Sequence, residues 1–174
     1  MPRKNKSVNK MQNNIFLRIE NLNQKLIICK SERMSFSADK TYELWNSFMT
    51  GRKKIQNPVS DELFSIQVYG ADFDFSSFRP DIMFLKMAGT EVKDFDSVPE
   101  SMEKFFIPAG LYAVFIHRGA ASEAPVTFGY IFGEWLPLSG YRVDSRPHFE
   151  ILGKKYRNND PSSEEEVWVP VKPK

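Results

Sequence analysis

The chain has 174 residues, of which 41% are hydrophobic and 26% are charged, and its formal net charge is +2. This length is enough for one compact domain with a sizeable core. The small net charge gives no argument for nucleic-acid binding. Aromatic residues make up 14% of the chain, and they either fill the core or line an apolar pocket.

The chain offers few candidates for metal or redox chemistry. Cys29 is the single cysteine, so no disulfide can form within the chain, and we expect it to be a small core residue. His117 and His148 are the only histidines, and no Cys/His set has metal-ligand spacing. We therefore expect no cofactor and no metal.

Hydropathy predicts the location of the chain. No apolar run approaches the ~20 residues that cross a bilayer. The N-terminus is basic, but no apolar signal core follows it. We therefore expect a cytoplasmic protein with no membrane partner.

The first half begins with a polar, basic segment, residues 1–14, which we expect to be a flexible tail. Residues 15–36 contain a long strand pattern that includes a candidate turn. Apolar residues then recur at helical spacing over residues 42–51. Residues 63–69 alternate as a strand, and residues 82–92 predict another.

The second half repeats this order of elements. Residues 102–117 predict strand, with a break at residues 108–110. Residues 124–138 predict a helix, and residues 147–152 and 166–171 predict two further strands. The residues expected on or near the buried side of the helix are Val126, Phe128, Ile131, Phe132, Trp135 and Leu136.

Both halves thus consist of strand, helix, strand and strand, and the order recurs after about 86 residues. Each half has one helix to cover one sheet face, so the other face needs a partner. We expect a single α+β domain over residues 15–174, with halves of about 15–97 and 98–174. The halves would form an antiparallel sheet or a partly closed barrel with helices packed on it. A ligand groove is expected at the seam between the halves.

Glu150 is the most informative single residue. It lies between Phe149 and Ile151 in an apolar strand that follows Pro147. On an open sheet face it would be a solvated charge. On an enclosed face its desolvation would cost several kcal/mol unless a cation or a hydrogen-bond donor meets it.

Several segments of the chain carry a resemblance to a known family. They are residues 107–119, 133–141, 147–150 and 167–172, with weaker segments at 42–48 and 65–69. On these segments, over about residues 15–172, the chain resembles the GyrI-like small-molecule-binding domain. That domain is also the effector-binding half of many AraC- and MerR-type transcription regulators.

The resemblance implies a site as well as a fold. Family members bind bulky, aromatic and often cationic molecules at the seam, and the acid that meets the cation corresponds to Glu150. Candidate aromatic walls are Tyr112, Trp135, Tyr69 and Trp168, each of which is equally a candidate for the core. We interpret Glu134 and the acidic run at residues 164–166 as solvated.

The implied function is a cytoplasmic small-molecule effector-binding protein of bacterial type. The regulators carry a helix-turn-helix segment, and nothing in this sequence encodes one, so we expect no direct DNA binding. A gyrase or regulator partner is implied by analogy alone. The alternative is a hydrolase of cyclopropane-containing toxic compounds, in which Glu150 stabilises developing positive charge. A further alternative is a groove filled by the protein's own Phe side chains.

Overall fold

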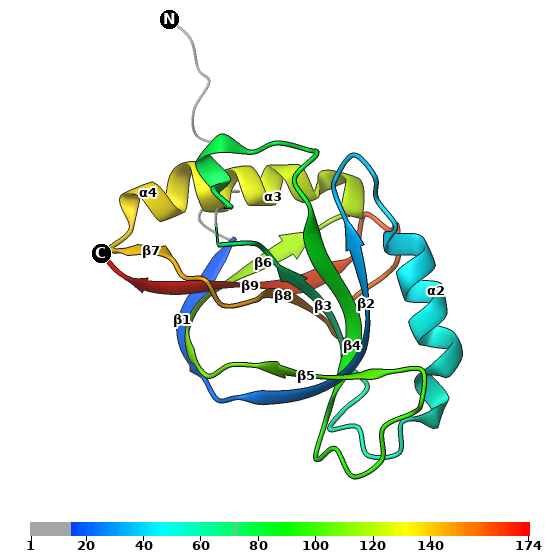
Figure 1. Cartoon of the computed structure of the whole chain (residues 1–174). Helices are drawn as coiled ribbons and strands as arrows, with labels where there is room; N and C mark the ends of the chain where they lie inside the picture. The colour runs from blue at the N-terminus through cyan, green and yellow to red at the C-terminus, as the bar shows by residue number, and fades with distance from the viewer. Residues whose placement is uncertain (1–14, 72) are drawn as a thin grey trace, which may run out of the picture.

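The computed structural model describes residues 15–71 and 73–174 (Figure 1). The basic tail predicted for residues 1–14 lies outside the described residues. The strands are β1 (Phe16–Leu22), β2 (Lys25–Met34), β3 (Leu63–Val68), β4 (Phe84–Val92), β5 (Glu103–Ile107), β6 (Gly110–Arg118), β7 (Tyr141–Val143), β8 (His148–Leu152) and β9 (Glu164–Pro173). The helical segments are α2 (Thr41–Gly51), η1 (Arg52–Lys54), η2 (Phe75–Ser77), η3 (Ala121–Glu123), α3 (Ala124–Tyr130), η4 (Ile131–Trp135) and α4 (Leu136–Leu138).

The strands form one sheet in the order β1-β6-β9-β8-β3-β4-β2-β5, and β7 pairs with β9. All pairs are antiparallel, and β1 and β5 are free edges, so the sheet is not closed. The order is symmetric about its centre. Strands β1, β2, β3 and β4 of the first half take the places that β5, β6, β8 and β9 of the second half take when the order is read from the other end. The predicted α+β fold with duplicated halves is confirmed.

The first strand pattern of each half forms a hairpin of two strands, and the second half also contains the short strand β7. Residues 15–36 form the hairpin of β1 and β2, and residues 102–117 lie within the hairpin of β5 and β6. The first strand of each half pairs with the other half, because β1 lies beside β6 and β5 lies beside β2. This exchange joins the halves at the edges, while the pairing of β3 with β8 joins them at the centre.

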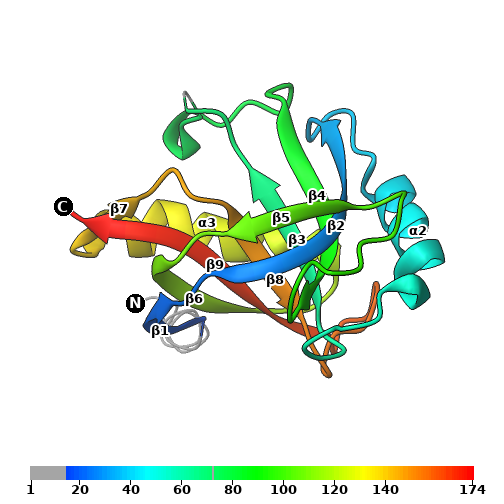
Figure 2. The ribbon, with the colours of Figure 1, turned by 60° about the horizontal axis from the view of Figure 1, so that its bottom comes forward.

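The sheet curls, so its two faces differ. Figure 2 shows β2 and β5 crossing in front of the central strands. The face inside the curl, which we call the inner face, holds a buried cluster of Leu22, Ile27, Cys29, Phe64, Ile66, Met87, Ile107, Tyr112, Val114, Phe149 and Trp168. Successive side chains of a strand point to opposite faces, so their neighbours lie on the other, outer face.

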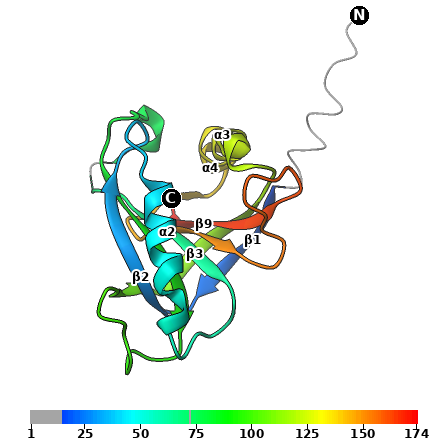
Figure 3. The ribbon, with the colours of Figure 1, turned by 90° about the vertical axis from the view of Figure 1, so that its right-hand side faces the viewer.

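The helices cover the outer face. Helix α2 packs Leu44 and Phe48 over a second buried cluster, and α3 with η4 packs Ile131 over a third. Figure 3 shows these two helical units lying apart on the molecule. No helix of the described residues is long and apolar enough to cross a membrane.

The predicted helix over residues 124–138 is one helical run, α3–η4–α4, with a π-helical turn in its middle. Its buried side is narrower than predicted. Ile131 is fully buried, but Val126 is 74% exposed, so the prediction that Val126 faces the core is wrong. Thr127 takes that place, and its hydroxyl lies 2.8 Å from His117 Nδ1.

Candidate ligand-binding site

The seam between the halves has a polar lining on its outer face. Strand β3 places Ser65 and Gln67 there, and β8 places His148 and Glu150 beside them, because Ser65 pairs with Glu150 and Gln67 with His148. The intervening Phe149 points into the inner cluster. Glu150 is therefore a half-buried carboxylate on the helix-bearing face, directly at the junction of the two halves.

A second carboxylate lies next to it. Glu150 pairs with Val167 on β9, and Glu165 is two residues from Val167 on the same face. Burial, and then the charge of Glu150, raise the pKa of Glu165 to about 7, while Lys86 opposes the shift. Glu150 and Glu165 thus form an acid pair in which one member holds its proton close to neutral pH.

The acid pair has no hydrogen-bond or ion-pair partner among the described residues, 15–71 and 73–174. Glu166, one position further along β9, instead binds Arg18 at 2.9 Å on the other face. The described residues contain no group of three or more His, Cys, Asp or Glu side chains suited to a metal ion.

Tyr69, whose pKa responds to the charge of Glu150, belongs to a group of five contacting rings, which we call the aromatic cluster: Tyr69, Phe73, Phe75, Phe132 and His148. The Phe75 ring from η2 stacks on Phe132 from η4 with centroids 4.0 Å apart and planes inclined by 7°. The Tyr69 ring lies 4.2 Å from that of Phe73 and 5.2 Å from that of His148. These contacts join the β3–β4 loop to the α3–η4 helix across the end of the seam.

The protonation states within the cluster are set by burial. Burial lowers the pKa of His148 to about 3, so its imidazole is neutral at physiological pH. Burial, and then the charge of Glu150, raise the pKa of the Tyr69 hydroxyl above its ordinary value, so it keeps its proton. The formal charge at this end of the seam therefore comes from the acid pair and Lys86.

A cavity of about 550 Å³ is lined by the aromatic cluster and, among the described residues, by neither member of the acid pair, and we call it the basic cavity. It lies beyond the N-terminal end of β8, between the β3–β4 loop, the end of the helical run, and β7 with the β7–β8 loop. Its charged lining residues are Arg142, Arg146, Lys172, Lys174, Asp74 and Asp144.

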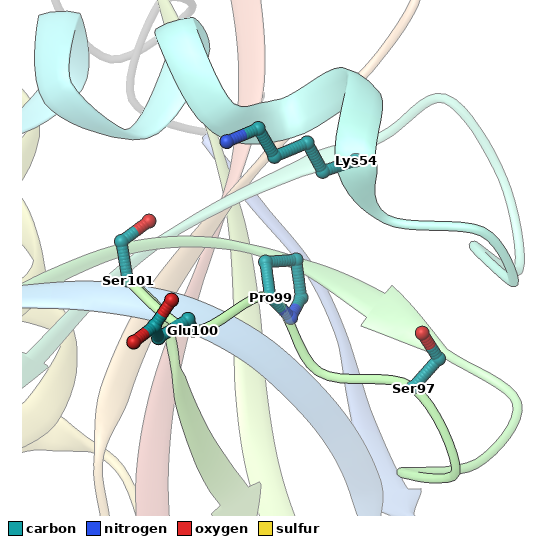
Figure 4. A pocket seen from close by; sticks show the side chains of 5 residues that line it. All are labelled: Lys54, Ser97, Pro99, Glu100 and Ser101. Atoms are coloured by element: carbon teal, nitrogen blue, oxygen red, sulfur yellow. The ribbon is translucent and has the colours of Figure 1, made fainter.

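A smaller depression of about 260 Å³ lies elsewhere, at the end of the α2–η1 helical run. Figure 4 shows Lys54 above the loop that carries Ser97, Pro99 and Ser101. It has no aromatic lining and lies away from the seam, so it is not part of the candidate site.

The predicted site residues fall into different parts of the structure. Glu150 and Tyr69 come together on the outer face, as the charge of Glu150 acting on Tyr69 shows. Tyr112 and Trp168 lie in the inner cluster with Phe149, on the opposite face of the sheet from Glu150. Tyr112 is 0% exposed and Trp168 3% exposed.

Trp135 belongs to the helical run, and its ring packs against the sheet and not against the acid pair. Its ring is 5.0 Å from that of Phe16 and 5.0 Å from that of Phe115, so it belongs to the packing between α3–η4 and β6. Glu134 is exposed on the same run.

The other parts of the site are not predicted by the sequence. Glu165 belongs to the acidic run that we interpret as solvated, and Phe73 and Phe75 lie in the loop between two predicted strands. The available signal was the density of aromatic residues in that loop, since a loop exposed to water rarely holds several large apolar rings.

The raised pKa of Glu165 predicts a pH-dependent stability. The folded protein binds this proton more tightly than the unfolded chain, whose carboxyl titrates near 4.5. The resulting stabilisation is present below about pH 4.5 and is lost as the pH rises through about 7. We expect Glu165→Gln to raise the free energy of unfolding at pH 8 by about 1–3 kcal/mol and to flatten its change between pH 5 and 8.

Urea unfolding at several pH values measures this effect. Glu100→Gln, at an exposed position far from the seam, is the matched control and should retain the wild-type pH profile. Parallel profiles for wild type and Glu165→Gln would contradict the assignment of this proton.

A curled antiparallel sheet made of two similar halves has a seam between them, and such junctions are common places for small-molecule sites. The chain belongs to the GyrI-like small molecule binding domain family, which matches residues 16–172. The chain is similar to the transcriptional regulator BrlR of Pseudomonas aeruginosa, with 26% identity over 166 residues. The match covers 88% of this chain and 57% of the regulator, so the chain spans little more than half of that relative.

Solved structures show the same fold. The C-terminal domain of EcmrR has a TM-score of 0.66 and 14% identity, covering 91% of this chain and 99% of that one. SAV2435 bound to tetraphenylphosphonium has a TM-score of 0.65 and 14% identity, covering 90% and 93% of the two chains. At these identities the likeness concerns the fold alone.

Proposed function

We propose that this domain binds a hydrophobic, aromatic organic cation at the seam, with Glu150 as the counter-ion. The acid pair carries this proposal, because neither of these two neighbouring carboxylates has a hydrogen-bond or ion-pair partner within the described residues, and Lys86 offsets only part of their charge. A bound cation would supply that partner.

The surroundings of the acid pair favour a cation that is large and apolar. Tyr69 and its neighbours in the aromatic cluster offer ring faces and edges beside Glu150. A cation over such a ring gains about 0.5–2 kcal/mol per well-placed contact. Selection by charge and aromatic surface, rather than by a set of directed hydrogen bonds, permits several ligands of the same class.

The charge balance at the seam limits the ligand to a single positive charge. Lys86 lies close enough to lower the pKa of Glu165 and so neutralises part of the acid pair. Glu150 then provides the main uncompensated charge. The tetraphenylphosphonium bound by SAV2435, a neighbour in fold, is a hydrophobic cation of this kind.

We further propose that the domain acts in the cytoplasm by sensing or sequestering its ligand. The relation to a transcriptional regulator fits a sensing role. DNA binding is not proposed for the described residues, whose charged cavity and seam both suit small molecules.

Isothermal titration with a matched pair of ligands tests the proposal. Tetraphenylphosphonium is the cation, and triphenylphosphine oxide is a neutral compound with similar phenyl groups. We expect the cation to bind at least about 10-fold more tightly, which corresponds to about 1.4 kcal/mol. Equal affinities, or no binding of the cation, would reject a cation-selective site.

The acid pair also supports a second candidate function, hydrolysis of strained cyclopropane-containing compounds. Glu165, with a pKa of about 7, could donate a proton while the Glu150 side chain stabilises positive charge in the transition state. We expect any turnover of a cyclopropane-bearing probe to be lost in both Glu150→Ala and Glu165→Gln. Binding of the probe without turnover in the wild type would eliminate this candidate.

A further inference from the structure

The basic cavity differs from the acid pair in its charge. Among the described residues, four cationic side chains line it, Arg142, Arg146, Lys172 and Lys174, against two carboxylates. Burial keeps His148 neutral, since its pKa is about 3, so the positive charge comes from the Arg and Lys residues. Its volume of about 550 Å³ lies within the usual range of small-molecule sites.

The two carboxylates leave part of this positive charge uncompensated. Asp144 is shared between Arg146, at 2.8 Å, and Lys172, at 3.4 Å. Asp74 accepts hydrogen bonds from Ser76 within its own loop. Neither carboxylate is an ion-pair partner of Arg142.

Arg142 is the cation without a partner. Its guanidinium makes no hydrogen bond or ion pair with any described residue. In the pairing of β7 with β9 it lies directly opposite Lys172, so two positive charges face one another across the strands. Like charges in this position are destabilising. Asp144 compensates Lys172 but not Arg142, whose exposed guanidinium is open to an anion.

Arg146 has a different role, because its guanidinium is fixed by the fold. Its Nη2 donates to the carbonyl oxygens of Leu111 and Val171, and its plane lies 4.6 Å from the centre of the Tyr112 ring. Gly110, with φ of 144°, leaves the space beside this guanidinium that a Cβ would fill. Arg146 therefore holds Asp144 and the β7–β8 loop in place.

The walls of the cavity are aromatic. Tyr69, Phe73, Phe75, Phe132 and His148 all line it. Of these rings, Tyr69 is also close enough to Glu150 for its pKa to respond to the charge of that residue. The acid pair is negative, whereas most of the charged described residues that line the cavity are positive. Figure 1 shows η2 and its loop beside the helical run.

We propose that the basic cavity is a second ligand site, which binds a flat aromatic anion such as an aromatic carboxylate or sulfonate. The rings of the ligand contact the aromatic cluster, and its acidic group lies between Arg142 and Lys172. This site shares the aromatic cluster with the one proposed at Glu150, but its charged groups are different, so binding of the anion does not require Glu150.

A matched pair of dyes tests this site. Anilinonaphthalene sulfonate is an aromatic anion, and N-phenylnaphthylamine has the same ring system without the sulfonate. By isothermal titration we expect the wild type to bind the sulfonate at least about 5-fold more tightly than the neutral amine. Arg142→Gln should weaken sulfonate binding by about 3- to 10-fold and leave the amine unchanged, and Arg142→Lys should retain most of the affinity.

Two control variants separate a local site from a general charge effect. Arg33→Gln removes the same charge from an exposed position on β2 and should leave both affinities within about twofold of wild type. Glu150→Gln should likewise leave sulfonate binding unchanged. Thermal melting of each variant shows that it is folded. Equal affinities of the two dyes, an equal loss in Arg142→Gln and Arg33→Gln, or a loss in Glu150→Gln would overturn the proposal.

Discussion

Glu150→Gln is expected to weaken the binding of tetraphenylphosphonium by about 5- to 150-fold, or about 1–3 kcal/mol. The substitution keeps the size of the side chain and removes its charge. Ser65 and Val167 pair with this residue through the backbone, so the sheet should be unaffected. Isothermal titration of wild type and variant at pH 7 gives the affinity ratio.

The neutral ligand and a distant variant complete this experiment. Triphenylphosphine oxide should bind Glu150→Gln as it binds the wild type, because it has no net charge to pair with the carboxylate. Glu100→Gln, which removes an exposed charge, should bind the cation normally. A similar loss for cation and neutral ligand would show that Glu150 contributes shape or packing rather than charge.

Phe149→Ala is expected to lower the free energy of unfolding by about 3–5 kcal/mol. The Phe149 ring is 0% exposed. It stacks on Trp168 with centroids 5.2 Å apart, and it lies 5.3 Å from the Tyr112 ring and 5.9 Å from that of Phe64. Removing it leaves a cavity at the point where the two halves meet, since Phe149 belongs to β8 and Phe64 to β3.

Urea denaturation measures this loss. Leu138→Ala, at a position that is 89% exposed, serves as the control and should change the stability by less than about 0.5 kcal/mol. A loss below about 1.5 kcal/mol in Phe149→Ala would mean that the inner cluster is not the core that holds the halves together.

The fold could be predicted from the sequence because the pattern was repeated. The alternation of residues 63–69 defines β3 and places Tyr69 on one face with Ser65 and Gln67. The same order of elements recurs after the break at residues 108–110, and the duplication itself calls for a shared sheet. β7 escaped prediction because a strand of three residues carries too little pattern to be recognised.

The face of the sheet on which a side chain lies is harder to predict for a strand that is buried on both faces. Residues 111–116 form an apolar run without alternation, so the sequence does not indicate which side chains point inward. Tyr112 takes the inner face because of its pairing with β1 and β9 and the curl of the sheet. The same holds for Trp168, whose indole Nε1 donates to Glu166 at 3.0 Å on that face.

The acid pair depends on register, which the sequence does not contain. Three successive glutamates begin β9, and only the alternation of the strand places Glu165 on the outer face and Glu166 on the inner one. Glu150 was identified because an isolated acid in an apolar strand is conspicuous. Glu165 resembled the start of a solvated strand.

The structure of the domain with bound tetraphenylphosphonium tests the central claim most directly. We predict that the phosphorus lies within about 6 Å of the Glu150 carboxylate, on the outer face of β8, with phenyl groups against Tyr69 and its neighbours. A cation bound in the basic cavity beside Arg142, or on the inner face beside Trp168, would contradict the account.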